Sequence, residues 1–146
     1  MRLLIQRVLE AKVIINKEIY SQINSGLLIF LGIHKEDKAS QIEWLVNKLV
    51  HLRIFPDEEG KMNLNIKEKG GEILAVSQFT LYGNCLNGRR PDFIQAAVPT
   101  VAEPLYQQFV EVLSQQIDGV KTGVFGAEMQ ISLINDGPVT FLLEKD

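Results

Sequence analysis

The sequence is poor in the residues that build metal sites and disulfides. Among its 146 residues there is one cysteine, Cys85, and there are two histidines, His34 and His51. A single cysteine cannot form an intramolecular disulfide, and one Cys with two His falls short of the four ligands of an ordinary zinc site. We therefore expect no disulfide and no metal in this chain.

Long apolar runs and excess positive charge are also absent. No apolar stretch approaches the ~20 residues that span a bilayer, and the start of the chain lacks the apolar segment and cleavage site of a signal peptide. These absences predict a cytoplasmic protein without a membrane partner. Lys and Arg number 15 against 18 Asp and Glu. The net charge of −3 has the wrong sign for a protein that covers nucleic acid through a broad basic surface. We expect no DNA partner, and an RNA partner must be held at a local patch.

Apolar patterning predicts one α+β domain over residues 1–146. A hydrophobic content of 46% is enough for a sizeable core, and no segment has the composition of a linker or a repeat. Strand-like runs outnumber helical ones and short turns join neighbours, so we predict a mostly antiparallel sheet. The predicted strands cover residues 3–15 with a continuation to 23, 26–33, 72–76, 120–124, 127–134 and 139–144.

Two helices are indicated by capping signals that precede helical apolar spacing. Ser40 and Glu43 form a capping-box pattern ahead of an apolar stripe with a period near 3.6, which continues to Arg53. Thr100 and Glu103 form a second capping-box pattern, and this helix is expected to end near Gly119. Between the two helices, residues 57–61 are expected to form a turn.

Two short polar segments, each at the end of an apolar run, are the strongest functional signals. The Ser-Gln segment, Ser77-Gln78-Phe79-Thr80-Leu81-Tyr82-Gly83, follows the buried strand predicted at 72–76. The Gly-Pro segment, Asn135-Asp136-Gly137-Pro138-Val139-Thr140, follows an alternating strand. Taken alone, the Gly-Pro segment is typical of a hairpin turn between two strands.

Together, the two segments closely resemble those of the D-aminoacyl-tRNA deacylases, enzymes that free tRNA from wrongly attached D-amino acids. Further matches occur in the family's order over the whole chain, which makes the resemblance specific. They are Arg7-Val8, Gly26-Leu27-Leu28, Gly88-Arg89-Arg90-Pro91 and Thr122-Gly123-Val124-Phe125-Gly126-Ala127-Glu128-Met129. The resemblance implies a β-barrel-like sheet with helices packed outside, assembled as a homodimer.

The resemblance also implies a hydrolase that needs no metal and no cofactor. Its substrate would be D-aminoacyl-tRNA, bound at the acceptor end, and glycyl-tRNA mischarged on tRNA(Ala) is expected as a second one. In this family the bond between Gly137 and Pro138 is cis, so that two carbonyls point the same way and hold the substrate's α-amino group. An L side chain would then be rejected by a clash. This segment is implied to enter the partner subunit's pocket, with the active site at the subunit interface.

Ser77, Gln78, Phe79 and Thr80 are the predicted catalytic group. Backbone N–H groups in this segment would stabilise the oxyanion, and the family resemblance implies that the 2′-hydroxyl of the terminal adenosine relays a proton or positions the water. Thr80 as a nucleophile is an alternative, although its hydroxyl needs a base and no His-Asp pair lies nearby in the sequence. The two histidines of the chain are interpreted as solvent-facing.

Five further residues are given supporting roles. Phe125 and Met129 either line the pocket of the Ser-Gln segment or belong to the core. Arg7 interrupts an apolar strand, and by the family match it lies near the Gly-Pro segment and fixes its carbonyls. Arg89 and Arg90 form either a basic patch for tRNA phosphates or a solvated loop. The family has a single arginine there, so which of the two contacts RNA stays open.

A non-catalytic interpretation also stays open. A dimeric tRNA-binding scaffold with the same barrel would bind tRNA without turnover and would not depend on Ser77, Gln78 or Pro138. A paralogous group with this architecture acts on a different mischarged tRNA and differs around the Ser-Gln segment. The intact Ser77-Gln78-Phe79-Thr80 therefore favours the branch that acts on D-amino acids.

Overall fold

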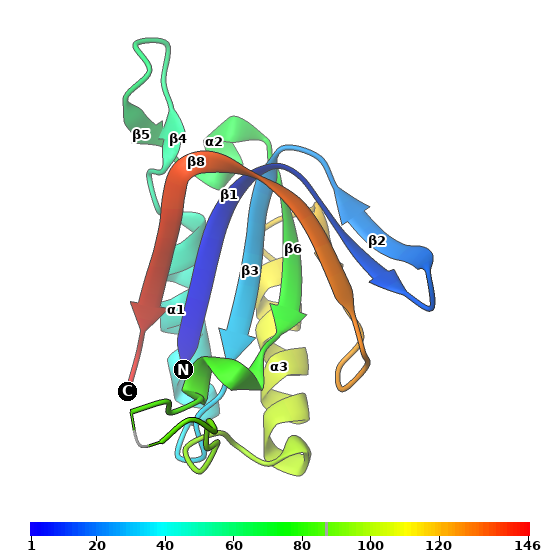
Figure 1. Ribbon diagram of the computed structural model, residues 1–146. Coiled ribbons are helices and arrows are strands. Elements are labelled where there is room, and N and C mark those ends of the chain that lie inside the picture. Colours follow the sequence, from blue (N-terminus) through cyan, green and yellow to red (C-terminus); the bar gives the residue numbers. More distant parts are fainter. Residues whose placement is uncertain (87) are drawn as a thin grey trace.

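A curled six-stranded sheet with helices packed on one face forms the body of the protein (Figure 1). The computed structural model describes residues 1–86 and 88–146. The sheet consists of β1 (Arg2–Ile15), β2 (Glu18–Ile23), β3 (Gly26–Gly32), β6 (Glu72–Ser77), β7 (Val120–Thr122) and β8 (Gln130–Glu144). The helices are α1 (Ile42–Val50), α2 (Ile66–Lys69) and α3 (Pro99–Ser114), with short 3-10 turns η1 (Ala39–Gln41) and η2 (Phe79–Tyr82). A separate ribbon pairs β4 (Phe55–Pro56) with β5 (Met62–Leu64).

Strand β1 is the centre of the sheet. β8 pairs along one side of β1, and β3 and then β2 pair along the other side. From β3 the order continues to β6 and β7. The Oγ of Ser21 in β2 donates a 2.7 Å hydrogen bond to the carbonyl of Thr122 in β7, which draws these two outer strands together. The sheet is therefore nearly closed, and the predicted α+β fold with a barrel-like sheet is confirmed.

The prediction of a mostly antiparallel sheet is wrong, because the sheet is mixed. β3 pairs with β6 in parallel, and β6 pairs with β7 in parallel. Parallel neighbours need a crossover connection, and α1 and α3 lie in the two connections. Strands β3 and β6 are buried on both faces of the sheet, which explains why residues 26–31 and 73–76 are nearly unbroken apolar runs.

The main core lies between the sheet and helices α1 and α3. The predicted stripe of α1 is confirmed, because Ile42, Leu45, Val46 and Leu49 are fully buried. Alternate residues of β3 and β6 point to opposite faces, so each of these strands contributes to two clusters. The cluster on the helical side includes Leu27, Ile29, Ile73, Ala75, Tyr106 and Phe109, and the smaller one on the other side includes Val8, Val13, Leu28, Leu74 and Val76.

The helix ends differ from those expected. η1 precedes α1, and the Oε1 of Gln41 accepts the backbone N–H of Lys38, so the cap lies earlier than Ser40. α3 begins at Pro99, which suits the first helical position because it has no N–H to leave unpaired. It ends at Ser114, ahead of the expected Gly119. In the part of the chain that the structure describes, no helix is long and apolar enough to cross a membrane.

The Gly-Pro segment is a bulge and not a hairpin turn. β8 runs as one strand from Gln130 to Glu144, and both of its halves pair antiparallel with β1. Asn135 pairs with Val8, and Thr140 pairs with Gln6, so residues 136–139 of β8 stand opposite Arg7 alone. A bulge of this kind bends the strand and turns its extra residues out of the ladder. In Figure 1, β8 arches over the top of β1 before it descends to the C-terminus.

Candidate active site

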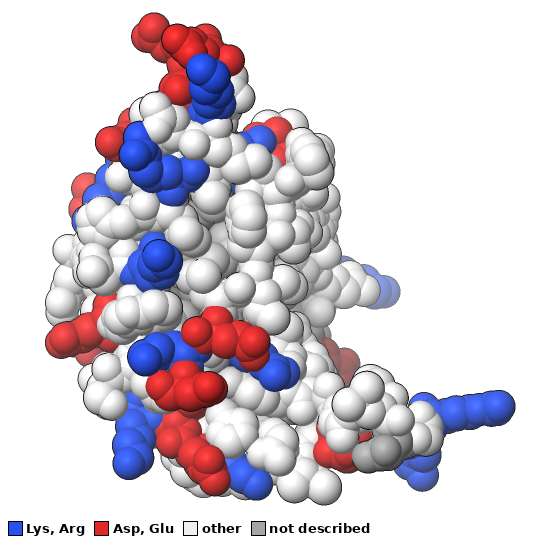
Figure 2. Space-filling view, turned by 90° about the vertical axis from the view of Figure 1, so that its left-hand side faces the viewer, with Lys and Arg blue, Asp and Glu red and all other residues white. Residues whose placement is uncertain are grey.

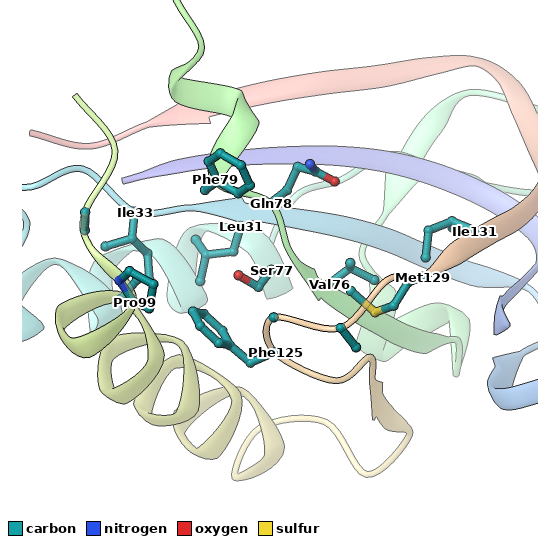
Figure 3. Close-up of a pocket in the computed structure, with 14 residues that line it drawn as sticks. Leu31, Ile33, Val76, Ser77, Gln78, Phe79, Pro99, Phe125, Met129 and Ile131 are labelled. Carbon is teal, nitrogen blue, oxygen red and sulfur yellow. The ribbon is translucent and has the colours of Figure 1, made fainter. Parts of the chain in front are cut away.

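A cavity of about 460 Å³ opens at the carboxyl end of β6. Ser77, the last residue of β6, projects into it, and Phe125 faces Ser77 from the loop before β8 (Figure 3). The first residue of α3, Pro99, and the aromatic ring of Phe79 flank the same space. The remaining lining comes from β3 and β6 with the residues that follow them, from α3 and the segment before it, from the β7–β8 connection and from the start of β8: Leu31, Ile33, Val76, Gln78, Ala97, Ala102, Gly126, Ala127, Met129 and Ile131. The site is therefore an apolar cavity with a small polar rim.

The Ser-Gln segment is held against β3 by close packing. The backbone N–H of Gln78 donates to the carbonyl of Leu31 at 2.8 Å, which continues the β3–β6 ladder past the strand end. A Cβ on Gly32 would meet the Cβ of Leu81 at 2.9 Å and the carbonyl oxygen of Gln78 at 3.1 Å. Only glycine therefore lets η2 approach β3 this closely. This contact fixes where the backbone of the segment leaves the sheet.

The first turn of η2 leaves two backbone donors free of helical bonds. The first hydrogen bond of the turn runs from the N–H of Leu81 to the carbonyl of Gln78 at 3.3 Å. The N–H groups of Phe79 and Thr80 precede that bond and have no partner within the turn. Phe79 and Thr80 follow Ser77 by two and three residues, so their N–H groups are the backbone donors of this segment that a negatively charged oxygen could use.

Thr80 and the two histidines lie outside the cavity lining. Thr80 is exposed, and its Oγ1 accepts a 2.5 Å hydrogen bond from the Nε2 of Gln78. The ring of His34 packs at a tilt against that of Tyr82, with a centroid distance of 5.2 Å, and its Nε2 lies 2.9 Å from the Oε1 of Gln95. His51 contacts the carbonyl of Asn47. Within the described residues, no histidine lines this cavity.

A buried tyrosine supports the wall of the cavity. Tyr106 of α3 donates a 2.9 Å hydrogen bond to the carbonyl of Ala75 in β6, two residues before Ser77. Its ring packs 5.9 Å from that of Phe125. Burial raises the pKa of Tyr106 to about 12, so the hydroxyl remains a neutral donor at physiological pH. Helix α3 thereby fixes both the strand that ends at Ser77 and the ring opposite to it.

Met129 owes its position to a glycine. A Cβ on Gly123 would lie 2.5 Å from the Sδ of Met129, closer than any real contact. The thioether therefore occupies the space that a side chain at residue 123 would fill. From there Met129 packs against the smaller core cluster while it lines the cavity.

Gly123→Ala is expected to narrow the cavity, because the added methyl group drives Met129 toward the substrate space. If the cavity binds the D-aminoacyl-tRNA that the sequence resemblance implies, KM for D-tyrosyl-tRNA is expected to rise roughly tenfold, the effect of a methylene-sized change in an apolar pocket. The matched control is Gly119→Ala, whose nearest neighbour is the flexible Cγ of Glu72. Steady-state deacylation kinetics of both variants test this, and an unchanged KM for Gly123→Ala would contradict it.

Gly137 and Pro138 are exposed on the bulge, and the peptide bond between them is cis. The Nδ2 of Asn135 donates to the carbonyls of Arg7 at 3.0 Å and Val139 at 3.1 Å, so one amide group ties the bulge to β1 and closes its base. A Cβ on Gly137 would meet the Oδ1 of Asn135 at 2.9 Å. The shape of the bulge therefore depends on both side chains: the amide at residue 135 and the hydrogen atom at residue 137.

Arg7 lies beneath the bulge and is 8% exposed. Its Nη1 donates to the carbonyl of Ile54 at 2.5 Å, and its Nε lies 2.8 Å from the Oδ2 of Asp136 as an ion pair that is not aligned as a hydrogen bond. This carboxylate compensates the buried charge. Arg7 thus reaches the Gly-Pro segment through Asp136.

The structure does not bring the Gly-Pro segment to the cavity of its own chain. Ser77 is level with Leu31 of β3 and Leu3 of β1, whereas the bulge is level with Arg7. Measured along the surface of the curled sheet, four residues along the strands and three strand spacings across it amount to roughly 20 Å. Ser77, Gln78, Phe79, Phe125 and Met129 meet in one cavity, and Gly137 and Pro138 stand apart from them.

Arg89 and Arg90 are exposed on the loop between η2 and α3. Asn87, which precedes Gly88 in the sequence motif, lies outside the described residues. Three further residues of the site, Tyr106, Gly123 and Asn135, were given no role by the sequence patterns, although Gly123 and Asn135 lie within the matched segments. Tyr106 and Asn135 make hydrogen bonds to residues far away in the chain, so no local signal marks these roles.

The fold is shared with solved structures of other proteins. A solved structure described as a probable eukaryotic D-amino acid tRNA deacylase has this fold, with a TM-score of 0.84 over 97% of each chain and 19% sequence identity. A solved structure of the c-Myc DNA Unwinding Element Binding Protein is nearer in sequence, with 42% identity and a TM-score of 0.95 over 100% of this chain and 99% of that one.

Sequence comparison identifies the family. Residues 4–144 match the model of the D-Tyr-tRNA(Tyr) deacylase family. A relative from Protochlamydia amoebophila, named D-aminoacyl-tRNA deacylase, is 65% identical over 99% of this chain and 95% of its own length. A relative of the same name from Thermotoga petrophila is 51% identical over 99% of this chain and 97% of its own. The chain belongs to the D-Tyr-tRNA(Tyr) deacylase family, which is a family of hydrolases, and the resemblance seen in its sequence is confirmed.

Proposed function

We propose that this chain hydrolyses the ester bond of D-aminoacyl-tRNA in the Ser77 cavity, and that two copies of the chain build each active site. The observation that carries the proposal is that a member of the deacylase family has a cavity with Ser77 and Gln78 on its polar rim. The products are free tRNA and a D-amino acid. A cytoplasmic location, where charged tRNA is used, fits this activity.

The reaction is a water attack assisted by backbone groups and by the RNA. The oxygen of water bonds to the ester carbonyl carbon, and the N–H groups of Phe79 and Thr80 bind the oxyanion that forms. The carbonyl then re-forms as the bond to the ribose 3′-oxygen breaks, and that oxygen takes up, through the neighbouring 2′-hydroxyl, the proton that the attacking water loses. Losing one oxyanion donor typically costs about 3 kcal/mol of transition-state stabilisation.

Two observations support this route over a side-chain nucleophile. Histidine is missing from the described lining of the cavity, so a hydroxyl there has no neighbouring imidazole to activate it. Thr80 lies outside the lining, and its hydroxyl is engaged by Gln78. We assign Thr80 the role of holding the side chain of Gln78 at the rim.

Chiral selection is assigned to the Gly-Pro segment of the partner subunit. Measured along the sheet, the segment lies roughly 20 Å from the cavity of its own chain, and it is exposed on the bulge, which supports contact with a cavity on another molecule. The Gly137 and Pro138 carbonyls would bind the substrate's ammonium group and leave no room for an L side chain. Because the D side chain needs no close fit, the site accepts varied D-amino acids and also glycine, including glycyl-tRNA mischarged on tRNA(Ala).

The test compares matched D- and L-tyrosyl-tRNA with the wild-type protein and with Thr80→Ala. The wild type is expected to release D-tyrosine and to leave the L ester intact, and equal cleavage of both esters would refute chiral selection. Thr80→Ala is expected to retain nearly full activity. A loss of several orders of magnitude would instead indicate an acyl-enzyme formed on Thr80, and tRNA binding without turnover by the wild type would indicate a scaffold.

A further inference from the structure

An exposed apolar strip begins at the mouth of the cavity and leads away from it. Phe79 lines the cavity and is 54% exposed, and its ring meets that of Phe93 edge-on at a centroid distance of 5.0 Å. Phe93 is 37% exposed, and Ile94 beside it is 71% exposed. Burying apolar side chains of this size is favourable in free energy, so an exposed run of them next to a cavity is typical of a binding surface.

Hydrogen bonds close the neck of the loop that precedes Phe93 and Ile94. The backbones of Asn84 and Asp92 exchange hydrogen bonds of 2.9 and 3.0 Å across its neck, and the Nδ2 of Asn84 donates to the Oδ2 of Asp92 at 3.1 Å. The Oδ1 of Asp92 also accepts the N–H of Ile94. Past the strip, the N–H of Lys35 donates to the carbonyl of Gln95, which joins the loop to the segment after β3. Phe93 and Ile94 are therefore presented on a preformed surface.

The solvent-facing charge on this loop is positive. Arg89 and Arg90 are exposed, and no ion pair to either is found among the described residues. Asp92 is the one acidic residue between 83 and 98, and its carboxylate is used inside the neck. At the lower right of Figure 2 the loop protrudes from the body, with basic side chains extending from it.

We infer that this strip binds the unpaired 3′-terminal strand of the tRNA, the CCA nucleotides that carry the ester into the cavity. Bases of this strand would stack on Phe79, Phe93 and Ile94, and its phosphates would lie against Arg89 and Arg90. An aromatic platform beside basic side chains is the way proteins hold single-stranded RNA, because every base has a face that can stack. The grooves of an RNA duplex would leave these apolar side chains without a partner. The inference rests on the proposed function, since it extends the same site.

The experiment measures binding of an uncharged RNA hairpin with an unpaired CCA-3′ end, and of the same hairpin with that end removed. The wild type is expected to bind the first more tightly. Phe93→Ala is expected to weaken this binding about tenfold, and Ile94→Ser by a smaller factor, without changing the affinity for the blunt hairpin. Ile19→Ser on β2 is the matched control, because Ile19 is a similarly exposed isoleucine remote from the loop.

The arginines are tested by the salt dependence of the same binding. Replacing Arg89 and Arg90 by Gln is expected to flatten the slope of log affinity against log salt by about 0.7 for each phosphate that an arginine no longer neutralises. Removing the same charge from α2, with Lys67→Gln and Lys69→Gln, is expected to leave the slope unchanged.

Three outcomes would overturn the inference: equal wild-type binding of both hairpins, unchanged binding by Phe93→Ala and Ile94→Ser, or conversion of the Phe93→Ala protein to a monomer. The last outcome would assign the strip to contact between copies of the chain. Uncharged RNA contains no ester, so these results do not depend on hydrolysis. A failure of the proposed function would be seen separately, as absent turnover of D-tyrosyl-tRNA by the wild type.

Discussion

Two inactive variants of this chain are expected to recover activity when they are purified together as a mixed dimer. Ser77→Leu fills the cavity at the end of β6, where the serine projects. Gly137→Ala brings a methyl carbon within 2.9 Å of the Oδ1 of Asn135 and so displaces the Gly-Pro segment. As a homodimer, each variant is expected to lose at least about 100-fold in deacylation rate, because substrate positioning is lost.

The recovery follows from the distance between the two lesions. If each cavity is completed by the partner's Gly-Pro segment, a mixed dimer contains one site with both lesions and one with neither. Its activity toward D-tyrosyl-tRNA is then expected to be about half that of the wild-type dimer. If the segment served its own chain, each site would carry one lesion and the mixed dimer would stay inactive.

The measurement uses co-expression of the two variants with different affinity tags and two successive purification steps. Thermal unfolding of each parent variant shows whether the loss of activity is local, as expected for two partly exposed positions. A mixed dimer as inactive as its parents would contradict the two-copy site, as would a wild-type protein that remains monomeric at assay concentrations.

The secondary structure could be predicted from the sequence wherever the signal is local. The stripe of α1 is visible in the spacing of Ile42, Leu45, Val46 and Leu49, and the structure buries all of them. The short helix α2 has an equally local signal. Asn65 and Glu68 form a reciprocal capping box, and Gly70 ends the helix in a left-handed conformation.

The strand order could not be predicted in the same way. Gly26 of β3 lies beside Glu72 of β6, and a Cβ on Gly26 would come within 1.9 Å of the carbonyl oxygen of Glu72. Pairings between strands so far apart in the chain are decided by the packing of α1 and α3, which no window of sequence contains. At α3 two start signals overlap, and Pro99 at the first helical position prevails over the Thr100 capping box.

The candidate site was found by resemblance more than by pattern. The cavity joins Ser77 and Gln78 to Phe125 and Met129, which are separated by about fifty residues and lie at the ends of different strands. The Asn-Asp-Gly-Pro string satisfies every local rule for a hairpin turn. It forms a bulge because the side chain of Asn135 is hydrogen-bonded to the carbonyl of Arg7, 128 residues away, and because β8 pairs with β1 on both sides of the string.

Asn135→Asp is expected to uncouple the bulge from β1 with almost no change in side-chain size. The native Nδ2 donates to two carbonyls, those of Arg7 and Val139. A carboxylate in its place would present an oxygen to both, so two hydrogen bonds become two repulsive contacts. We expect a loss of about 2 kcal/mol in the free energy of unfolding, since the site is partly open to water.

The effect of this substitution on catalysis is expected to exceed its effect on stability. Residues 136–139 stand opposite Arg7 alone, so the Asn135 amide is the main bond that fixes the course of the bulge. A shift of about 1 Å at the Gly-Pro segment would misplace the carbonyls proposed to hold the ammonium group, and displacements of that size cost about 100-fold in rate. Slow cleavage of L-tyrosyl-tRNA is also expected to appear. Together with the fall in the rate for D-tyrosyl-tRNA, it lowers the ratio of the D to the L deacylation rate.

The control is Ser132→Asp, which adds the same charge to an exposed position on the same strand. Deacylation of D- and L-tyrosyl-tRNA and thermal unfolding are measured for both variants. If Asn135→Asp unfolds at a lower temperature but keeps the wild-type D rate and the wild-type D/L ratio, Asn135 only stabilises the sheet. If Asn135→Asp lowers the D/L rate ratio while Ser132→Asp keeps the wild-type ratio, chiral selection depends on the geometry of the bulge and not on the added charge.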